Sequence, residues 1–264
     1  MSGLDATVSG GNLLRLQNVY KSFARTDAND VTHALSAIDL KVEDGEFVSI
    51  VGPSGCGKST ILRLVAGLIV PTSGTLTLNG VPITKPDPER GMVFQRPTLF
   101  PWLTVEQNLN FSPRMLKRGN AMKEEAERLL DLAGLAEFRN DFPHQLSGGM
   151  AQRLALIRTM INNPKVFLLD EPLGALDAFT RMHMQDELLG LWQRSGHMML
   201  MVTHDIDEAL YLGTRVVVMA PRPGRIRVDI SNTMPYPRNR TSAAFLQYRK
   251  EVLEMLDFGH AEAG

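Results

Sequence analysis

The sequence predicts an α/β fold whose core is a parallel, doubly wound sheet. Short apolar runs with the pattern of buried strands alternate with stretches of helical periodicity. A glycine-rich turn joins one of these runs to the helix after it, and a long segment with helical but no strand pattern interrupts the alternation. Strands that alternate with helices are typical of a parallel sheet with helices on its faces. The long helical segment is therefore expected to be an insertion into that core.

The amino-terminal part is expected to hold a small antiparallel sheet. Residues 1–12 are mostly polar, and we expect them to be flexible. The segments 14–19 and 34–42 have the pattern of half-exposed strands joined by a loop rich in Thr, Asp and Asn. A mostly apolar run at 46–51 is typical of a buried strand, and the helical pattern 59–67 follows its glycine-rich turn.

Parallel strands separated by helices are expected to complete the core. Three more apolar runs have the pattern of buried strands: 166–169, 198–202 and 215–219. No strand pattern appears in 104–161, so we expect a helical subdomain at about 97–161. The main domain is expected to cover 13–233, and a tail at 234–264 is expected to contain an amphipathic helix at 243–256.

Composition narrows the class of protein. The chain has 264 residues, of which 44% are hydrophobic and 22% charged, and this excludes disordered, collagen-like and disulfide-scaffold proteins. Its net charge of -1 provides no broad positive field, so we expect no nucleic-acid partner. Cys56 is the single cysteine, and the amino terminus lacks the layout of a signal peptide, which favours a cytosolic location. No apolar run reaches the roughly 20 residues of a membrane span.

A phosphate-binding loop is predicted between the strand at 46–51 and the helix after it. The string GPSGCGKS fits the pattern G-x-x-x-x-G-K-[ST] in the strand, loop and helix context that the pattern requires. Its glycines let backbone N–H groups turn inward around phosphates, and the helix amino end adds its dipole. Lys58 is expected to reach the β- and γ-phosphates and Ser59 to bind Mg²⁺, whereas a turn that only joins strand to helix is the alternative. The expected nucleotide-binding residues are Gly52, Pro53, Ser54, Gly55, Cys56, Gly57, Lys58, Ser59 and Thr60.

Two carboxylates follow the apolar run at 166–169. Asp170 and Glu171 would lie at the carboxyl end of a buried strand, where ligands bind in open α/β sheets. Asp170 is a candidate Mg²⁺ ligand, and Glu171 can polarise an attacking water. A solvated strand end is the alternative for both residues.

The chain resembles the ATP-binding cassette (ABC) ATPase family over nearly its whole length. Six motifs occur in the family's order and approximate spacing: GPSGCGKST, the Gln of MVFQ, LSGGM, VFLLDEP, GALD and the His of VTHD. The resemblance implies a P-loop NTPase core with a parallel sheet, an antiparallel β subdomain and a helical subdomain insertion. It assigns 13–233 to the ATP-binding domain and implies ATP and Mg²⁺ as cofactors.

The resemblance also implies roles for residues outside the phosphate loop. Phe23 matches the aromatic that stacks on adenine, with Tyr20 as a less favoured substitute and an ordinary core phenylalanine as the alternative. Gln95 would contact Mg²⁺ and the lytic water, unless it simply ends a strand. His204 matches the switch residue that contacts the γ-phosphate and positions the water activated by Glu171. A capping box that begins at Asp205 also fits and leaves His204 free.

Two nucleotide sites across a head-to-tail homodimer are implied by the same resemblance. Ser147, Gly148 and Gly149 would bind the γ-phosphate held by the other subunit. Asp177 matches the loop that links the two sites, and a helix N-cap is its alternative role. Met150 stands where the commoner signature has Gln, but the backbone donors remain, so we expect hydrolysis to survive.

LSGGMAQR together with FPW resembles most the nitrate/sulfonate/taurine importer branch. The branch implies an ATP-hydrolysing subunit that energises uptake of a small anion or related solute through separate membrane permease subunits. A substrate-binding protein would be an indirect partner, and the chain would lie peripherally on the cytoplasmic face of the inner membrane. The alternative is a soluble ABC ATPase that acts as an assembly factor, for example for iron–sulfur clusters.

Two surface features complete the expectations. Leu99, Phe100 and Trp102 form a candidate docking surface for the permease, with a satellite core under the helical insertion as the alternative. Five arginines near the end of the main domain form a local basic cluster that we expect to be a solvated surface: Arg222, Arg225, Arg227, Arg238 and Arg240.

Overall fold

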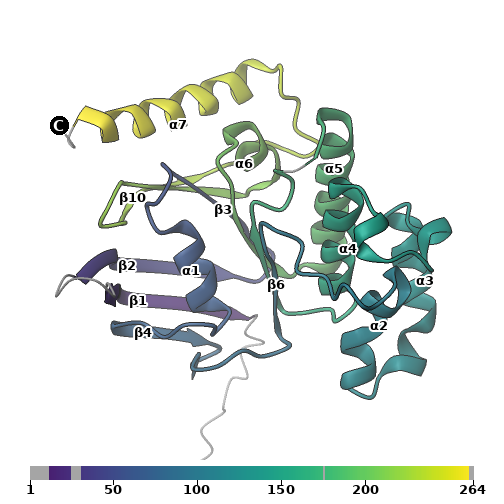
Figure 1. Ribbon diagram of the computed structural model, residues 1–264. Helices are drawn as coiled ribbons and strands as arrows, with labels where there is room; N and C mark the ends of the chain where they lie inside the picture. Colours follow the sequence, from purple (N-terminus) through teal and green to yellow (C-terminus); the bar gives the residue numbers. More distant parts are fainter. Residues whose placement is uncertain (1–11, 25–30, 175, 262–264) are drawn as a thin grey trace, which may run out of the picture.

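The computed structural model describes residues 12–24, 31–174 and 176–261 and has the predicted α/β architecture with two sheets (Figure 1). Apart from residue 12, the segment expected to be flexible lies outside the described residues. The described strands form a small sheet in the order β2-β1-β4-β5 and a larger sheet in the order β10-β9-β3-β8-β7-β6. None of the helices in this part of the chain is long and apolar enough to cross a membrane.

The small sheet is antiparallel, as predicted, and more extensive than predicted. Its strands are β1 (Leu13–Ala24), β2 (Val31–Glu43), β4 (Ser73–Leu78) and β5 (Val81–Pro82). β1 continues beyond Val19 because bulges interrupt the register without ending the pairing. At one bulge Asn18 has a φ of 48°, and its N–H donates to the Asp39 carboxylate at 2.8 Å.

The larger sheet is parallel except at one edge. Its strands are β3 (Phe47–Val51), β6 (Arg90–Val93), β7 (Val166–Asp170), β8 (Met198–Val202), β9 (Arg215–Met219) and β10 (Ile226–Ser231). β10 pairs antiparallel to β9, and the other pairs are parallel. Every residue of β3, β7 and β8 is buried, which explains why these strands are apolar apart from Ser49 in β3 and Asp170 at the end of β7.

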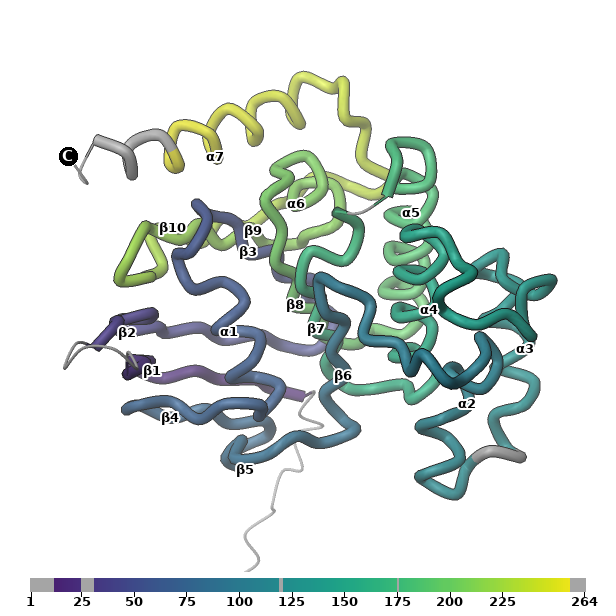
Figure 2. The backbone as a smooth tube through the Cα atoms, viewed as in Figure 1, coloured from purple at the N-terminus to yellow at the C-terminus, as the bar shows by residue number. Residues whose placement is uncertain are grey.

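Helices cover both faces of the larger sheet. The helix α1 (Lys58–Val65) lies between the two sheets, and its apolar side chains join one core with both of them. On the opposite face lie α5 (Ala178–Ser195), α6 (Ile206–Leu212) and α7 (Ala243–Ala261), which share a second core (Figure 2).

The helical part of the chain lies on the side away from the small sheet. It contains α2 (Val105–Met115), α3 (Lys123–Leu132) and α4 (Gly148–Met160) with three short 3₁₀ helices, Gly119–Met122, Ala136–Phe138 and Pro143–Gln145. These helices enclose a third apolar core of their own. The described residues of 97–161 include no strand, so the predicted helical insertion is present in the fold.

The expectation that all five arginines of the basic cluster are solvated is wrong for Arg238. Arg238 is 5% exposed, and its guanidinium donates to the carbonyl oxygens of Leu210 and Gly213, each at 2.6 Å. These carbonyls lie at the carboxyl end of α6, where backbone acceptors lack partners within the helix. Arg238 therefore caps a helix inside the protein.

Candidate functional site

The predicted site residues follow four neighbouring parallel strands. The phosphate loop follows β3, Gln95 follows β6, Asp170 ends β7 and His204 follows β8. Because parallel strands end at the same edge of a sheet, these residues meet at one edge. A cavity of about 390 Å³ opens there, and its lining is Phe23, Thr32, Ala34, Ser54, Gly55, Gly57, Lys58, Ser59, Thr60, Gln95, Glu171 and Arg222.

The conformation of the phosphate loop requires glycine at two positions. Gly55 and Gly57 have φ angles of 77° and 96°, in the left-handed region that side chains disfavour. A Cβ at Gly57 would also lie 2.5 Å from the Cδ2 atom of Leu35. The loop therefore folds tightly against β2, and its backbone follows the cavity wall as the phosphate-loop mechanism requires.

Lys58 is buried at the start of α1. Its ammonium donates to the carbonyl oxygens of Gly52 at 2.7 Å and Pro53 at 3.0 Å. These neutral acceptors hold the cation against the loop, whereas phosphate oxygens would be stronger partners for it. Lys58 is thus in place to bind an anion that enters the cavity.

Ser59 and Asp170 lie together under the phosphate loop. The Ser59 hydroxyl donates to the Asp170 carboxylate at 2.8 Å. Burial raises the pKa of Asp170, and the hydrogen bond from Ser59 acts in the opposite direction. A bound cation would offset the cost of burying this carboxylate. Together with the side-chain amide of Gln95, these groups offer the oxygen ligands that Mg²⁺ prefers, so the residues fit the ion.

The structure brings Glu171, Gln95 and His204 together. The Gln95 amide donates to Glu171 Oε2 at 3.0 Å, and His204 Nδ1 lies 3.2 Å from the same oxygen. Glu171 has a φ of 47°, uncommon for a residue with a side chain, and its N–H donates to the Val202 carbonyl at 2.8 Å. Such backbone conformations gather at functional sites. One carboxylate oxygen is therefore held between an amide and an imidazole beside the phosphate loop.

Phe23 lies at the edge of the cavity and outside the core. Its side chain is 40% exposed, and the Lys21 ammonium lies 4.9 Å from the centre of its ring. Phe23 lines the cavity, whereas Tyr20 is not among the lining residues. The position suits stacking on a base better than core packing.

The structure does not bring the signature residues or Asp177 to this cavity. Ser147, Gly148, Gly149 and Asp177 are absent from its described lining. Ser147 caps α4 by accepting from the Met150 N–H at 3.2 Å, and Asp177 caps α5 by accepting from the Thr180 N–H at 3.0 Å. Hydrogen bonds with the side chain and the backbone N–H of Thr180 lower the pKa of Asp177. Ser147 and Asp177 keep enough exposure for contact with another subunit while they cap these helices.

Arg222 is a cavity residue that the sequence analysis missed. It was expected in a solvated cluster, but its Nε donates to the carbonyl oxygen of Gly55 at 2.7 Å. No motif marks it. The available signal was its place just after β9, at the same edge of the sheet where ligands bind.

Cys56 belongs to the predicted phosphate loop but is not among the described residues that line the cavity. The thiol is 1% exposed, and burial raises its pKa. A raised pKa leaves less thiolate at a given pH, so we expect alkylation by iodoacetamide to be slow in the folded protein and to accelerate with pH.

Bound MgATP should slow the alkylation of Cys56 further, because phosphates would hold the loop closed over the thiol. Mass spectrometry of the modified peptide, with and without MgATP, measures this rate. The same peptide from protein unfolded in urea is the control for intrinsic reactivity. Equal rates with and without MgATP would contradict nucleotide binding at this loop.

Comparisons with known proteins agree with this geometry. The family model for the ABC transporter matches residues 35–174. The chain is 42% identical over 244 residues to an aliphatic sulfonates import ATP-binding protein of Bacillus cereus, covering 92% of this chain and 96% of that protein. It is 45% identical over 246 residues to an uncharacterized ABC transporter ATP-binding protein of Methanocaldococcus jannaschii, covering 92% and 91%. A solved dimeric post-hydrolysis state of the ATP-binding cassette MJ0796, bound to ADP and Pi, superposes with a TM-score of 0.73 at 31% identity, covering 86% and 99%.

Proposed function

Because this chain belongs to the ABC transporter family, we propose that it is the ATP-hydrolysing subunit of an importer for a small anion or related solute. The observation that carries the proposal is the Glu171 carboxylate, held between Gln95 and His204 beside a phosphate loop. A similar protein is named for aliphatic sulfonate import, which supports the sulfonate class among the solutes of this branch. The assembly-factor alternative is not favoured, since these similar proteins are named for import.

ATP binding would use both sides of the cavity. The adenine would stack on Phe23, and the phosphates would follow the loop from Ser54 to Thr60. Lys58 would exchange the carbonyl oxygens of Gly52 and Pro53 for phosphate oxygens, a stronger charge-assisted interaction. Ser59, Asp170 and Gln95 would hold Mg²⁺, which when bound neutralises charge on the phosphate oxygens.

Hydrolysis would begin at Glu171. Its carboxylate accepts a proton from the water that attacks the γ-phosphorus, while the bond from that phosphorus to the bridging oxygen of ADP breaks. Gln95 and His204 both contact one oxygen of this carboxylate, so they orient it toward the water. ADP and inorganic phosphate are the products, and their release would allow the next cycle.

We propose a homodimer in which each subunit completes the site of the other. Ser147, Gly148 and Gly149 would reach the γ-phosphate of the partner, which accounts for their position outside the cavity of their own chain. Phe179 lies two residues after Asp177 and is 88% exposed. A large, exposed apolar side chain next to the loop that contains Asp177 suits a subunit interface. The similar cassette MJ0796 was solved as a dimer.

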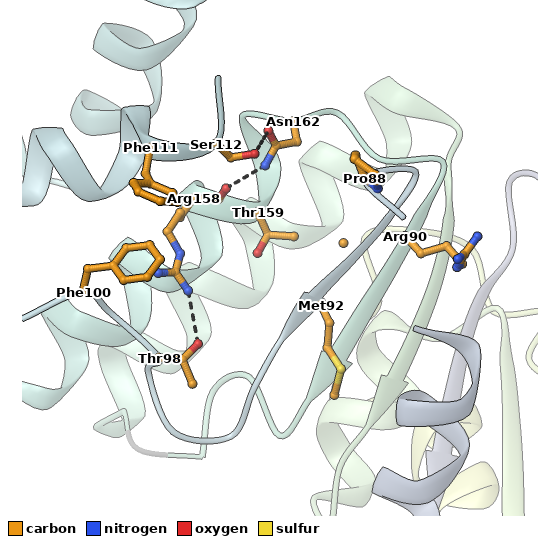
Figure 3. A pocket seen from close by; sticks show the side chains of 11 residues that line it. Pro88, Arg90, Met92, Thr98, Phe100, Phe111, Ser112, Arg158, Thr159 and Asn162 are labelled. Carbon is orange, nitrogen blue, oxygen red and sulfur yellow. Dashed lines mark hydrogen bonds between the residues drawn. The ribbon is translucent and has the colours of Figure 1, made fainter. Parts of the chain in front are cut away.

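Membrane permease subunits are the proposed second partner, on the cytoplasmic face of the membrane. Trp102 is 69% exposed, and its ring centroid lies 5.6 Å from that of Phe100. Phe100 packs on Phe111, with ring centroids 4.4 Å apart, and the Arg158 guanidinium lies 5.4 Å from its ring centre. Figure 3 shows Phe100, Phe111 and Arg158 around a cavity of about 480 Å³ between the helical part and β6. Leu99 packs into the cores instead, so the satellite-core alternative describes that residue.

Changing Trp102 to Ala should lower solute uptake by roughly tenfold and leave the ATPase rate of the isolated subunit within about twofold. The reason is that an exposed aromatic side chain contributes mainly to the binding free energy of an interface and little to the activity of the isolated subunit. Uptake of radiolabelled solute by cells and ATP hydrolysis by the purified subunit measure the two effects. Leu246→Ala removes a similarly exposed apolar side chain from α7 and is the matched control. Full uptake by the Trp102 variant would contradict the docking proposal.

The importer function itself is tested by reconstitution. The tagged chain is purified from native membranes in mild detergent, and the complex is placed in liposomes with MgATP inside. ATP-dependent solute movement with a multi-span permease in the complex is the expected result. Recovery of soluble partners alone would favour the assembly-factor alternative.

A further inference from the structure

The turn between β9 and β10 contacts the phosphate loop directly. Arg222, in this turn, donates through Nε to the carbonyl oxygen of Gly55 at 2.7 Å. The approach is close, because a Cβ at Gly55 would lie 3.0 Å from Arg222 Nη2. Arg222 is also part of the lining of the cavity that contains the phosphate loop.

The same turn is joined to β2 of the small sheet. The Gly224 N–H donates to the Ala34 carbonyl at 3.0 Å, and the Ser36 N–H donates to the Gly224 carbonyl at 2.8 Å. A Cβ at Gly224 would lie 1.9 Å from the carbonyl oxygen of Cys56. Only glycine allows this approach, so the turn fits between the small sheet and the phosphate loop without spare room.

We propose that this turn, residues 221–225, is a brace that shapes the phosphate loop, and that Arg222 is a positioning residue for nucleotide binding. The brace connects β2, beside the base-binding end of the cavity, to the phosphate-binding end. It would fix the separation of the two ends before the nucleotide arrives. The proposal rests on the proposed function, because it assumes that a nucleotide binds in this cavity.

The planar peptide bond explains how Arg222 acts at a distance from the phosphates. The Gly55 carbonyl and the Cys56 N–H belong to one trans peptide unit and point in opposite directions. When Arg222 holds the carbonyl, the N–H is directed to the other side of the loop, where it donates to the Pro53 carbonyl over a long 3.3 Å. On nucleotide binding, this weakly bonded N–H would exchange the Pro53 carbonyl for a phosphate oxygen.

The charge of Arg222 is a separate contribution that the test must distinguish. No carboxylate in the described residues forms an ion pair with Arg222, so its positive charge adds to that of Lys58 around the cavity. A lysine at position 222 would keep the charge. It would not present the rigid, planar donor that now contacts the Gly55 carbonyl.

The test compares Arg222→Gln, Arg222→Lys and Arg227→Gln with the unchanged protein. Arg227 lies on the same hairpin but is not part of the cavity lining, so its variant makes the same charge change away from the loop. The affinities for MgATP and MgADP, and kcat and KM for ATP, are measured at a temperature where circular dichroism shows every variant folded. The rate of Cys56 alkylation without nucleotide is a second readout of loop order.

Loss of this charge-assisted hydrogen bond should weaken MgATP and MgADP binding by about tenfold in both Arg222 variants. KM should rise by a similar factor, kcat should stay within about twofold, and Cys56 should be alkylated faster. Arg227→Gln should behave as the unchanged protein does. Unchanged affinity in Arg222→Gln, a lower kcat with unchanged affinity, or full rescue by Arg222→Lys would overturn the positioning role.

Failure of the brace and failure of the proposed function give different results. If the unchanged protein binds no MgATP, the proposed function is wrong. If the unchanged protein binds MgATP and Arg222→Gln binds it equally well, only the brace is wrong.

Discussion

Replacing Glu171 with glutamine is expected to lower the ATPase rate by about a hundredfold or more and to leave MgATP binding intact. Glutamine has the size of glutamate, but its amide cannot accept a proton from water, and a positioned base contributes about a hundredfold or more. The phosphate loop, Lys58 and the pair formed by Ser59 and Asp170 are untouched by this change. Binding and hydrolysis should therefore separate in one variant.

The same Glu171 variant should accumulate as a closed dimer, because ATP that is bound but not hydrolysed keeps both subunits together. Light scattering coupled to size-exclusion chromatography, with and without MgATP, measures the dimer, and phosphate release measures the rate. Glu89→Gln is the matched control, since this carboxylate pairs with Lys165 on the surface, away from the site. Normal turnover by the Glu171 variant would refute its assignment as the base.

Changing Lys58 to alanine is expected to weaken MgATP binding by about a hundredfold or more. Two effects act in the same direction. The variant loses the cation that would contact the phosphates, and it loses the hydrogen bonds that close the loop onto Gly52 and Pro53. Hydrogen bonds from charged groups contribute about 1.5–3 kcal/mol each, and about 3 kcal/mol corresponds to roughly a hundredfold change in affinity.

Equilibrium binding of a fluorescent ATP analogue measures the effect of Lys58→Ala without dependence on hydrolysis. Lys85→Ala removes a lysine that is not part of the cavity lining and serves as the control. Near-normal affinity in the Lys58 variant would place the phosphates elsewhere. Such a result would also remove the basis for assigning the cavity to ATP.

The buried strands of the fold were predictable because a strand that is covered on both faces needs apolar side chains at nearly every position. β8 and β9 have the bounds that the sequence analysis expected, since both faces of a central parallel strand are covered and its residues are almost all apolar. β4, β5, β6 and β10 were missed. These strands are short and none is buried along its whole length, and in β10 apolar and charged residues alternate inside an arginine-rich stretch.

The residues of the candidate site also fall into those that could be predicted from the sequence and those that could not. Residues that belong to contiguous motifs, such as Lys58 and Glu171, could be assigned from the sequence because the chemistry fixes their spacing. Arg222 and Arg238 could not, since a charged residue outside a motif is expected in solvent. Their partners are backbone carbonyls of segments far away in the chain, and only the folded chain shows which carbonyls lack an internal partner.

The separation of the apolar side chains into three cores has a mechanical consequence. In the described residues, the core enclosed by α2, α3 and α4 shares only the partly buried Leu99 and Met160 with its neighbour on the sheet. α4 connects the two cores, because its Ala155 and Leu156 belong to the core on the sheet. Within the described part of the chain, α2 and α3 contribute no buried residue to that core, so local opening of these two helices leaves the packing on the sheet intact. Amide hydrogen exchange should detect α2 and α3 as a cooperative unit that opens more readily than β3, β7 and β8.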